Sequence, residues 1–253
     1  MKSASCRFFV FPGNITFVGF ISNFFNMLTF KKFLIWLSPR KKYIPEQISL
    51  EKKWAGSAYG GFFVHFPALS QNSLVLSFGV GEDISFDRQL IETSQVRVHA
   101  YDPTAGVSDF VKPLKEKTGK ITFLPVGLGV EDREEWFYPP ENPAHISCSV
   151  VPNESTRERA YPVQMKKLAS IVAEEGIDDF DLLKLDIEGA EYDVIPQILE
   201  DGFFPGQILV EVHPDLFPDG NEKTDALITL LNNHGYKIFG VSDTCRELSF
   251  IKL

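Results

Sequence analysis

Short apolar runs of strand length alternate with longer helix-like runs through most of the chain. We predict strands at residues 73–78, 96–101, 121–126, 181–186, 207–212, 236–241 and 246–253. Helices are predicted at 83–94, 165–176, 189–200 and 223–235, and a further helix follows the strand at 96–101 and extends to about residue 117. Residues 127–163 are predicted to be irregular. Such alternation is typical of an α/β fold, with a parallel sheet covered by helices on both faces. The last two strands lack an intervening helix, which predicts one antiparallel strand in the seven-stranded sheet.

Charge is unevenly distributed along the 253 residues. Residues 1–45 hold seven basic side chains and no acidic one, whereas 46–253 hold 18 basic and 34 acidic side chains. We therefore divide the chain into a basic, Phe-rich extension at 1–45 and a folded domain at 46–253. Nucleic-acid binding depends on basic side chains that neutralise phosphates, so the acidic domain argues against a nucleic-acid partner.

The uncharged stretch at residues 8–30 is long enough to span a bilayer. Pro12, Gly13 and three asparagines interrupt it, and it lacks the features of a secretory signal. Two interpretations stay open. In one, the segment spans a membrane or lies on its surface, and the basic residues that follow keep the domain on the cytoplasmic side. In the other, it is a helical cap packed on the domain or a poorly ordered extension. The three cysteines form no CxxC pattern, so we expect reduced thiols in a cytoplasmic protein.

A glycine turn, SFGVGEDISFD, follows the first strand. Ligands of open parallel sheets bind beyond the carboxyl ends of the strands, and Gly79 and Gly81 allow the backbone to approach one closely. Ile84 replaces the third glycine of the dinucleotide fingerprint, and Glu82 and Asp83 stand where a pyrophosphate would meet the helix. These acids favour a cofactor with ammonium and sulfonium groups, such as S-adenosylmethionine. In the alternative interpretation Asp83 simply caps the helix.

Two further strand ends offer cofactor contacts. Asp102 ends the second strand, 21 residues beyond Gly81, where an acid can accept hydrogen bonds from ribose hydroxyls; the alternative is a turn with Pro103. Gly127 and Gly129 follow the third strand and either admit an adenine ring or only end the strand.

Charged side chains also follow the fourth and fifth strands, in LKLDIEGAE and VEVHPD. Residues two apart in a strand share a face, so Lys184 and Asp186 lie on one face of their strand, and Glu211 and His213 on one face of theirs. If the two strands are neighbours, all four groups converge at one edge of the sheet. Buried charges are normally paired or functional; we interpret Lys184 as a structural charge, and Asp186 and His213 as functional.

The motifs SFGVGEDISFD, HAYDPT, LLKLDIEGAEYDVI and ILVEVH occur in an order that resembles the FkbM-type S-adenosylmethionine-dependent methyltransferases. The resemblance covers residues 46–253 and implies a Rossmann-like class I methyltransferase fold. It also implies cofactor contacts at Phe78, Gly79, Gly81, Asp83, Asp102, Gly127 and Asp186, and a transfer cleft lined by Asp186, Glu188 and His213. Many members are thought to methylate hydroxyls of sugar-like or natural-product acceptors, so we expect a small-molecule or glycan acceptor.

Transfer to an unactivated hydroxyl needs a group that removes its proton. His213 is the best candidate because its ordinary pKa lies near neutrality, and Asp186 is the second. A divalent cation held by Asp186, Glu188, Glu211 and His213 is a less favoured alternative, since their spacing matches no recognised metal motif. We therefore predict no metal site.

Two other functions stay open at this point. One is a nicotinamide-dependent oxidoreductase, against which Ile84 and the acids after Gly81 argue. The other is a non-catalytic module that binds S-adenosylmethionine or is tethered to a membrane. Aromatic residues could wall an acceptor pocket, although such residues more often belong to the core; they are Phe62, Phe63, His65, Trp136, Phe137 and Tyr138. The sequence leaves the oligomeric state open.

Overall fold

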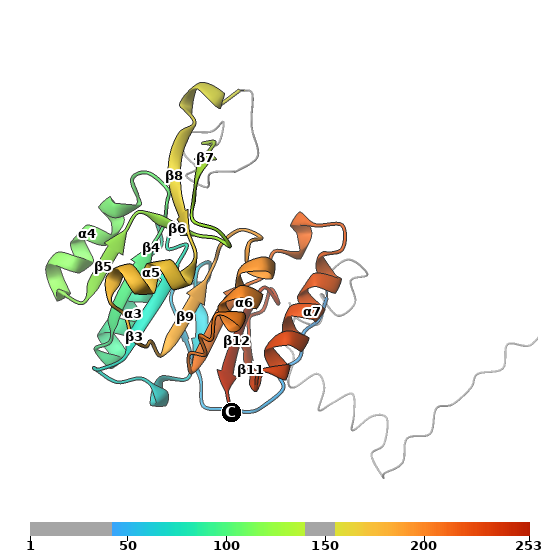
Figure 1. The fold of residues 1–253 in the computed structure, drawn as a ribbon. Coiled ribbons are helices and arrows are strands. Elements are labelled where there is room, and N and C mark those ends of the chain that lie inside the picture. Colours follow the sequence, from blue (N-terminus) through green and yellow to red (C-terminus); the bar gives the residue numbers. More distant parts are fainter. Residues whose placement is uncertain (1–41, 140–154) are drawn as a thin grey trace, which may run out of the picture. The chain divides into compact units, whose positions relative to one another are not determined.

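The computed structural model describes residues 42–139 and 155–253, which are built around a seven-stranded sheet (Figure 1). Five strands run parallel to one another, namely β3 (Leu74–Phe78), β4 (Arg97–Tyr101), β5 (Ile121–Leu124), β9 (Leu182–Leu185) and β10 (Gln207–Glu211). The sheet is completed by β11 (Tyr236–Val241) and β12 (Glu247–Lys252). Its strand order is β11-β12-β10-β9-β3-β4-β5.

The predicted antiparallel strand is β12. It lies between β10 and β11 and runs antiparallel to both, with Glu211 opposite Glu247. Every residue of β3 and β9 is buried, as expected for parallel strands covered on both faces. The predicted α/β fold, with a mostly parallel sheet of seven strands and one antiparallel strand, is confirmed.

Helices cover both faces of this sheet (Figure 1). They are α3 (Ser85–Ser94), α4 (Val107–Thr118), α5 (Leu168–Glu175), α6 (Glu191–Glu200) and α7 (Gly220–Asn233). Two helices end at a glycine in the left-handed region, α4 at Gly119 and α5 at Gly176, the predicted cap. Helix α7 begins three residues before the predicted position.

The expectation of irregular structure at 127–163 was wrong. The described part of this region contains β6 (Val126–Leu128), β7 (Arg133–Phe137) and β8 (Tyr161–Lys166), which form a second sheet in the order β6-β8-β7. The predicted helix at 165–176 therefore starts later, because Met165 and Lys166 pair with β6. Pairing with a distant segment has overridden the local pattern.

A short hairpin, β1 (Lys53–Ala55) and β2 (Phe62–Val64), precedes the main sheet and packs against α3, β11 and β12. Phe62 is buried in the hydrophobic core, so the structure does not support it as a pocket wall. The predicted membrane contact of residues 8–30 lies outside the described residues. Within 42–139 and 155–253, none of the helices has the length and apolar character needed to cross a membrane.

Candidate active site at the carboxyl edge of the sheet

The glycine turn after β3 has the backbone conformation that only glycine adopts easily. Gly79 has φ of +71° and Gly81 has φ of +53°. A Cβ atom on Gly79 would lie 1.7 Å from the carbonyl oxygen of Asp186, so the end of β9 fills the space beside it. A Cβ atom on Gly81 would meet nothing within 4 Å. The turn is therefore packed on one side and open to a ligand on the other.

Asp102 is buried at the end of β4 and fixes the same turn. Its Oδ2 accepts a hydrogen bond from the N–H of Gly81 at 2.9 Å, and its Oδ1 accepts one from the N–H of Thr104 at 2.8 Å. Each carboxylate oxygen can accept a second hydrogen bond. Asp102 thus links two strand ends and keeps acceptor capacity for hydroxyl groups.

Two other predicted cofactor residues have structural contacts of their own. The Phe78 ring is 1% exposed and stacks on Tyr101, with ring centroids 4.3 Å apart, so a cofactor contact would use its backbone. Asp83 accepts hydrogen bonds from Oγ of Ser57 at 2.5 Å and from N–H of Ser85 at 3.0 Å. Desolvation would raise the pKa of Asp83, but these hydrogen bonds outweigh it and lower the pKa. Asp83 therefore ties the loop after β1 to the start of α3.

Gly127 lies in β6, paired with Met165 of β8. A Cβ atom there would lie 2.3 Å from Sδ of Met165 and 3.1 Å from Cγ of Pro103, the residue after Asp102. Tight packing accounts for this glycine without a ligand. Its position next to the Asp102 loop agrees with the predicted adenine contact, which remains a prediction.

Lys184 is buried within β9 and serves as a structural clamp. Its Nζ donates hydrogen bonds to the carbonyl oxygens of Gly79 at 2.6 Å and Phe78 at 3.2 Å, and lies 3.7 Å from Oδ2 of Asp186. The interpretation of Lys184 as a paired structural charge is confirmed, although its nearest partners are carbonyl oxygens. The clamp holds the glycine turn against the end of β9.

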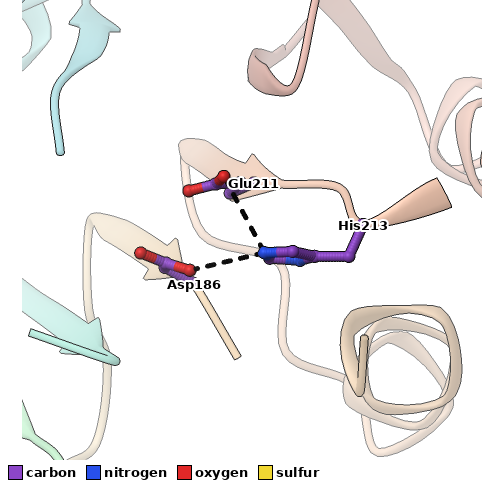
Figure 2. A group of neighbouring side chains, drawn as sticks. All are labelled: Asp186, Glu211 and His213. Carbon is purple, nitrogen blue, oxygen red and sulfur yellow. Dashed lines mark ion pairs between the residues drawn. The ribbon is translucent and has the colours of Figure 1, made fainter. Parts of the chain in front are cut away.

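Asp186, Glu211 and His213 converge beyond the ends of β9 and β10, as predicted for neighbouring strands (Figure 2). Nε2 of His213 lies 3.9 Å from Oδ1 of Asp186 and 3.8 Å from Oε1 of Glu211. The Glu188 carboxylate, at 3.5 Å from Nε2, is 67% exposed and sits in the turn before α6 with φ of +51°. Strained backbone of this kind clusters at functional sites. The predicted catalytic residues thus form one cluster.

The other nitrogen of the His213 ring faces Glu191. Oε1 of Glu191 lies 3.2 Å from Nδ1 of His213, and Glu191 is fully buried at the start of α6. Burial of the ring would lower the pKa of His213, but the Glu191 hydrogen bond and charge, with the charges of Glu211 and Glu188, raise it to about 9. The ring therefore holds a proton near neutrality, which differs from the premise on which His213 was predicted as the base.

Glu211 has the opposite balance between burial and charge. Burial, followed by the charges of Asp186 and Glu247, raises the pKa of Glu211 to about 7, although His213 and Lys184 oppose this rise. Carboxylates are thus concentrated at this edge of the sheet, and the repulsion between them is reduced by cationic groups. Sequence reasoning considered Glu211 only as a metal ligand.

Two residues at this edge were not among the predicted site residues. Glu191 was missed because an acid in the first turn of a helix is common on exposed surfaces; it is buried here and also accepts a hydrogen bond from the N–H of Gly189 at 2.8 Å. Tyr59, in the exposed loop after β1, has a pKa raised first by partial desolvation and then by the charges of Asp186 and Glu211. That loop therefore borders the acidic edge.

The site fits S-adenosylmethionine in three respects. Gly81 leaves open space for a ligand, Asp102 retains acceptor capacity beside it, and carboxylates cluster next to the turn where ammonium and sulfonium groups would be favoured. Gly79, Gly81 and Asp102 would hold the cofactor, with Asp186 at its reactive end.

Residues 55–238 match the model of a protein family described as "Methyltransferase FkbM domain". The match spans most of the chain and contains five of the seven strands of the main sheet in full, β3, β4, β5, β9 and β10. It favours methyl transfer over the nicotinamide-dependent and non-catalytic alternatives.

Among curated proteins, the chain is 32% identical over 88 residues to the AMB antimetabolite synthetase AmbE of Pseudomonas aeruginosa. This segment is 34% of the chain but only 4% of that synthetase.

Solved structures with a similar fold include two archaeal fibrillarins and a bacterial precorrin enzyme. Fibrillarin of Methanococcus jannaschii has a TM-score of 0.43 and 11% identity, covering 72% of this chain and 67% of that one. Fibrillarin of Aeropyrum pernix, solved with S-adenosyl-L-methionine, has a TM-score of 0.41 and 11% identity, covering 74% and 68%. The C-terminal domain of precorrin-6Y C5,15-methyltransferase from Rhodobacter capsulatus has a TM-score of 0.39 and 12% identity, covering 74% and 83%. Likenesses this distant say nothing about the substrate.

Proposed function

The chain belongs to the FkbM methyltransferase domain family and is an S-adenosylmethionine-dependent methyltransferase; from this premise we propose that it methylates a hydroxyl oxygen of a sugar-like or natural-product acceptor. The observation that carries the proposal is the cluster of Asp186, Glu211 and His213 beside the glycine turn (Figure 2). A hydroxyl acceptor requires groups that take up its proton. Two such groups, the carboxylates of Asp186 and Glu211, stand at this edge beside the protonated ring of His213.

S-adenosylmethionine supplies an electrophilic methyl group when bound. The chain contributes a fixed place for it: the left-handed turn at Gly79 and Gly81, the clamp of Lys184, and the acceptor capacity of Asp102. Such positioning of two reactants lowers the barrier by removing their freedom to move apart.

We assign the acceptor's proton to the carboxylates of the Asp186, Glu211 and His213 cluster. His213 lies at its centre with Nε2 directed at both carboxylates, and Glu191 holds the ring in this orientation. A hydroxyl placed between these groups can hydrogen-bond to a carboxylate and pass its proton to it. Glu188, which is more exposed, stands at the outer side of the cluster.

Methyl transfer from radiolabelled S-adenosylmethionine to a panel of monosaccharides, oligosaccharides, phenols and amines tests the acceptor class. We expect labelled methyl ethers of hydroxyl acceptors. Asp186→Asn and Glu211→Gln should lower that rate at least about 100-fold, the typical contribution of acid–base groups. The matched control is Asp215→Asn, which removes a carboxylate that pairs with Arg246 outside the cluster. Transfer to amines alone, or unchanged rates in the two cluster variants, would contradict the proposal.

We further propose that residues 1–45 bring the enzyme to an anionic membrane surface from the cytoplasmic side. The support is their seven basic side chains without an acid, next to a Phe-rich stretch. Flotation with vesicles that contain anionic lipid should retain the full chain and not a chain that starts at residue 46. Equal flotation of the two chains argues against a role for this segment.

A further inference from the structure

We propose that Asp186, Glu211 and His213 form a binding site for one divalent metal ion. Each offers one ligand atom, and these three atoms lie within 4.8 Å of one another. Glu211 is the last residue of β10, and Asp186 and His213 follow the adjacent strands β9 and β10 by one and two residues, so the sheet brings the three together (Figure 2). The mixed set of two carboxylates and one imidazole suits a divalent ion such as Mn²⁺.

The distances in this cluster need only a small adjustment to surround an ion. Nitrogen and oxygen ligands lie about 2.0–2.2 Å from a small divalent ion, so two ligand atoms on one ion are about 3–4 Å apart. Nε2 of His213 is 3.9 Å from Asp186 and 3.8 Å from Glu211. Rotation of the two carboxylates toward the imidazole would bring all three atoms onto a single ion.

The His213 ring is arranged as metal-ligating histidines are. Its side chain is only 7% exposed, and Nδ1 lies against the buried carboxylate of Glu191. Ligating histidines usually donate their second ring N–H to a carboxylate in this way, which fixes the tautomer and the ring plane. Among the described residues, Nε2, the nitrogen that faces Asp186 and Glu211, makes no hydrogen bond; its nearest carboxylate oxygen is that of the exposed Glu188, at 3.5 Å. An almost fully buried ring nitrogen is thus directed into the cluster, where a bound ion would replace its proton.

Charge at this edge also favours a cation. Asp186, Glu188, Glu191 and Glu211 carry carboxylates within 4 Å of the His213 ring. Lys184 is the basic side chain that pairs with this group, and it faces Oδ2 of Asp186, which leaves Oδ1 toward His213. Partly buried carboxylates repel one another unless a cation stands between them. Lys184 neutralises part of the Asp186 charge on the Oδ2 side, and the side of the cluster that faces His213 stays negative.

With the ion bound, the site would favour a narrower class of acceptor than the cluster of side chains alone. An octahedral ion held by three protein atoms keeps three positions for other oxygens. Two of them would suit adjacent hydroxyls of one acceptor, whose proton the ion makes easier to remove. This role rests on the proposed function, whereas binding of the ion does not.

Titration of the full, metal-free chain with MnCl₂ alone, followed by electron paramagnetic resonance of free Mn²⁺, tests the site. We expect one Mn²⁺ per chain, and at least about tenfold weaker binding in Glu211→Gln and His213→Gln, since loss even of a residue behind a ligand costs 10–100-fold. Asp215→Asn should bind Mn²⁺ within about threefold of wild type, because it removes one nearby carboxylate that is not a ligand. Absence of binding, or equal binding by all four proteins, would overturn the proposal.

Two further measurements distinguish loss of the metal site from misfolding of a variant and from failure of the proposed function. Thermal melting shows whether each variant is folded, and Glu211→Gln, which keeps the shape of the side chain, decides the question if His213→Gln does not fold. Binding of S-adenosylhomocysteine is measured without metal. Cofactor binding without Mn²⁺ binding would overturn the metal site and leave the methyltransferase account standing. Mn²⁺ binding together with failure to methylate any hydroxyl acceptor would contradict the proposed function alone.

Discussion

Glu191 and His213 are linked twice: Oε1 of Glu191 accepts a hydrogen bond from the backbone N–H of His213 at 2.8 Å and lies 3.2 Å from its Nδ1. The first residue of α6 is thereby connected to the loop that follows β10. Oε2 of the same carboxylate accepts from the N–H of Gly189. One buried carboxylate thus fixes both the turn before α6 and the ring at the centre of the site.

Glu191→Gln tests this link. The amide NH₂ cannot accept hydrogen bonds, so at least one backbone N–H loses its partner inside the protein. We expect the free energy of unfolding to fall by about 2–4 kcal/mol, measured by urea denaturation. The methylation rate should fall more than the affinity for S-adenosylhomocysteine, because the ring loses its orientation while the glycine turn stays. Wild-type stability in this variant would contradict the account of Glu191.

Gly79→Ala and Gly81→Ala form a matched pair. Both add one methyl group at positive φ, which costs roughly 1–2 kcal/mol. In Gly79→Ala the methyl also collides with the carbonyl oxygen of Asp186, whereas in Gly81→Ala it meets open space. We expect the first to destabilise the fold by more than about 3 kcal/mol and the second mainly to weaken cofactor binding. Thermal melts and calorimetric titration distinguish the two, and equal effects would contradict the structure.

Asp102→Ala tests the predicted ribose contact. The substitution removes two possible hydrogen bonds to ribose and leaves the N–H of Gly81 without its carboxylate partner. We expect binding of S-adenosylhomocysteine to weaken about 10–100-fold, equivalent to 1.4–2.8 kcal/mol. Asp109→Ala, which removes an exposed acid from the first turn of α4, serves as the control and should bind normally. Unchanged affinity in Asp102→Ala would remove this residue from the cofactor site.

Stability should depend on pH through His213 when metal is absent. Its pKa is raised from 6.5 to about 9, so the folded state binds this proton more tightly than the unfolded state. The resulting stabilisation is complete below pH 6.5 and is lost as the pH rises to 9, by at most about 3 kcal/mol. Urea denaturation between pH 6 and 9.5 in a chelating buffer measures it. His213→Gln should show a smaller decline over this range, and a flat wild-type profile would argue against the raised pKa.

Much of the main sheet was predictable because each of its strands is a short apolar run that can be recognised in the local sequence. The apolar runs of β3 and β9 are bounded by glycines and charges, and the lack of a helix before the last strand predicted the antiparallel β12. The second sheet was not predictable locally. Its strand β8 depends on pairing Met165 with Gly127, 38 residues away, and the sequence around Met165 has a helical pattern.

The part of the site that was predictable is the set of residues that the strand ends place at one edge of the sheet. Residues at the ends of neighbouring parallel strands lie close together, so the convergence of Asp186 and His213 followed from the strand pattern on the condition that the two strands are neighbours, as β9 and β10 are. The raised pKa of His213 did not, since it depends on Glu191, which approaches from a helix. The packing that leaves no space for a Cβ atom between Gly79 and the carbonyl oxygen of Asp186 likewise depends on how two loops pack.

The claim that this edge of the sheet is an S-adenosylmethionine site is tested most directly by calorimetric titration of the full chain. S-adenosylmethionine, S-adenosylhomocysteine and NAD are titrated separately into the same metal-free protein. The account predicts one molecule of either sulfur compound per chain and no heat of binding from NAD. Binding of NAD with neither sulfur compound bound would contradict it.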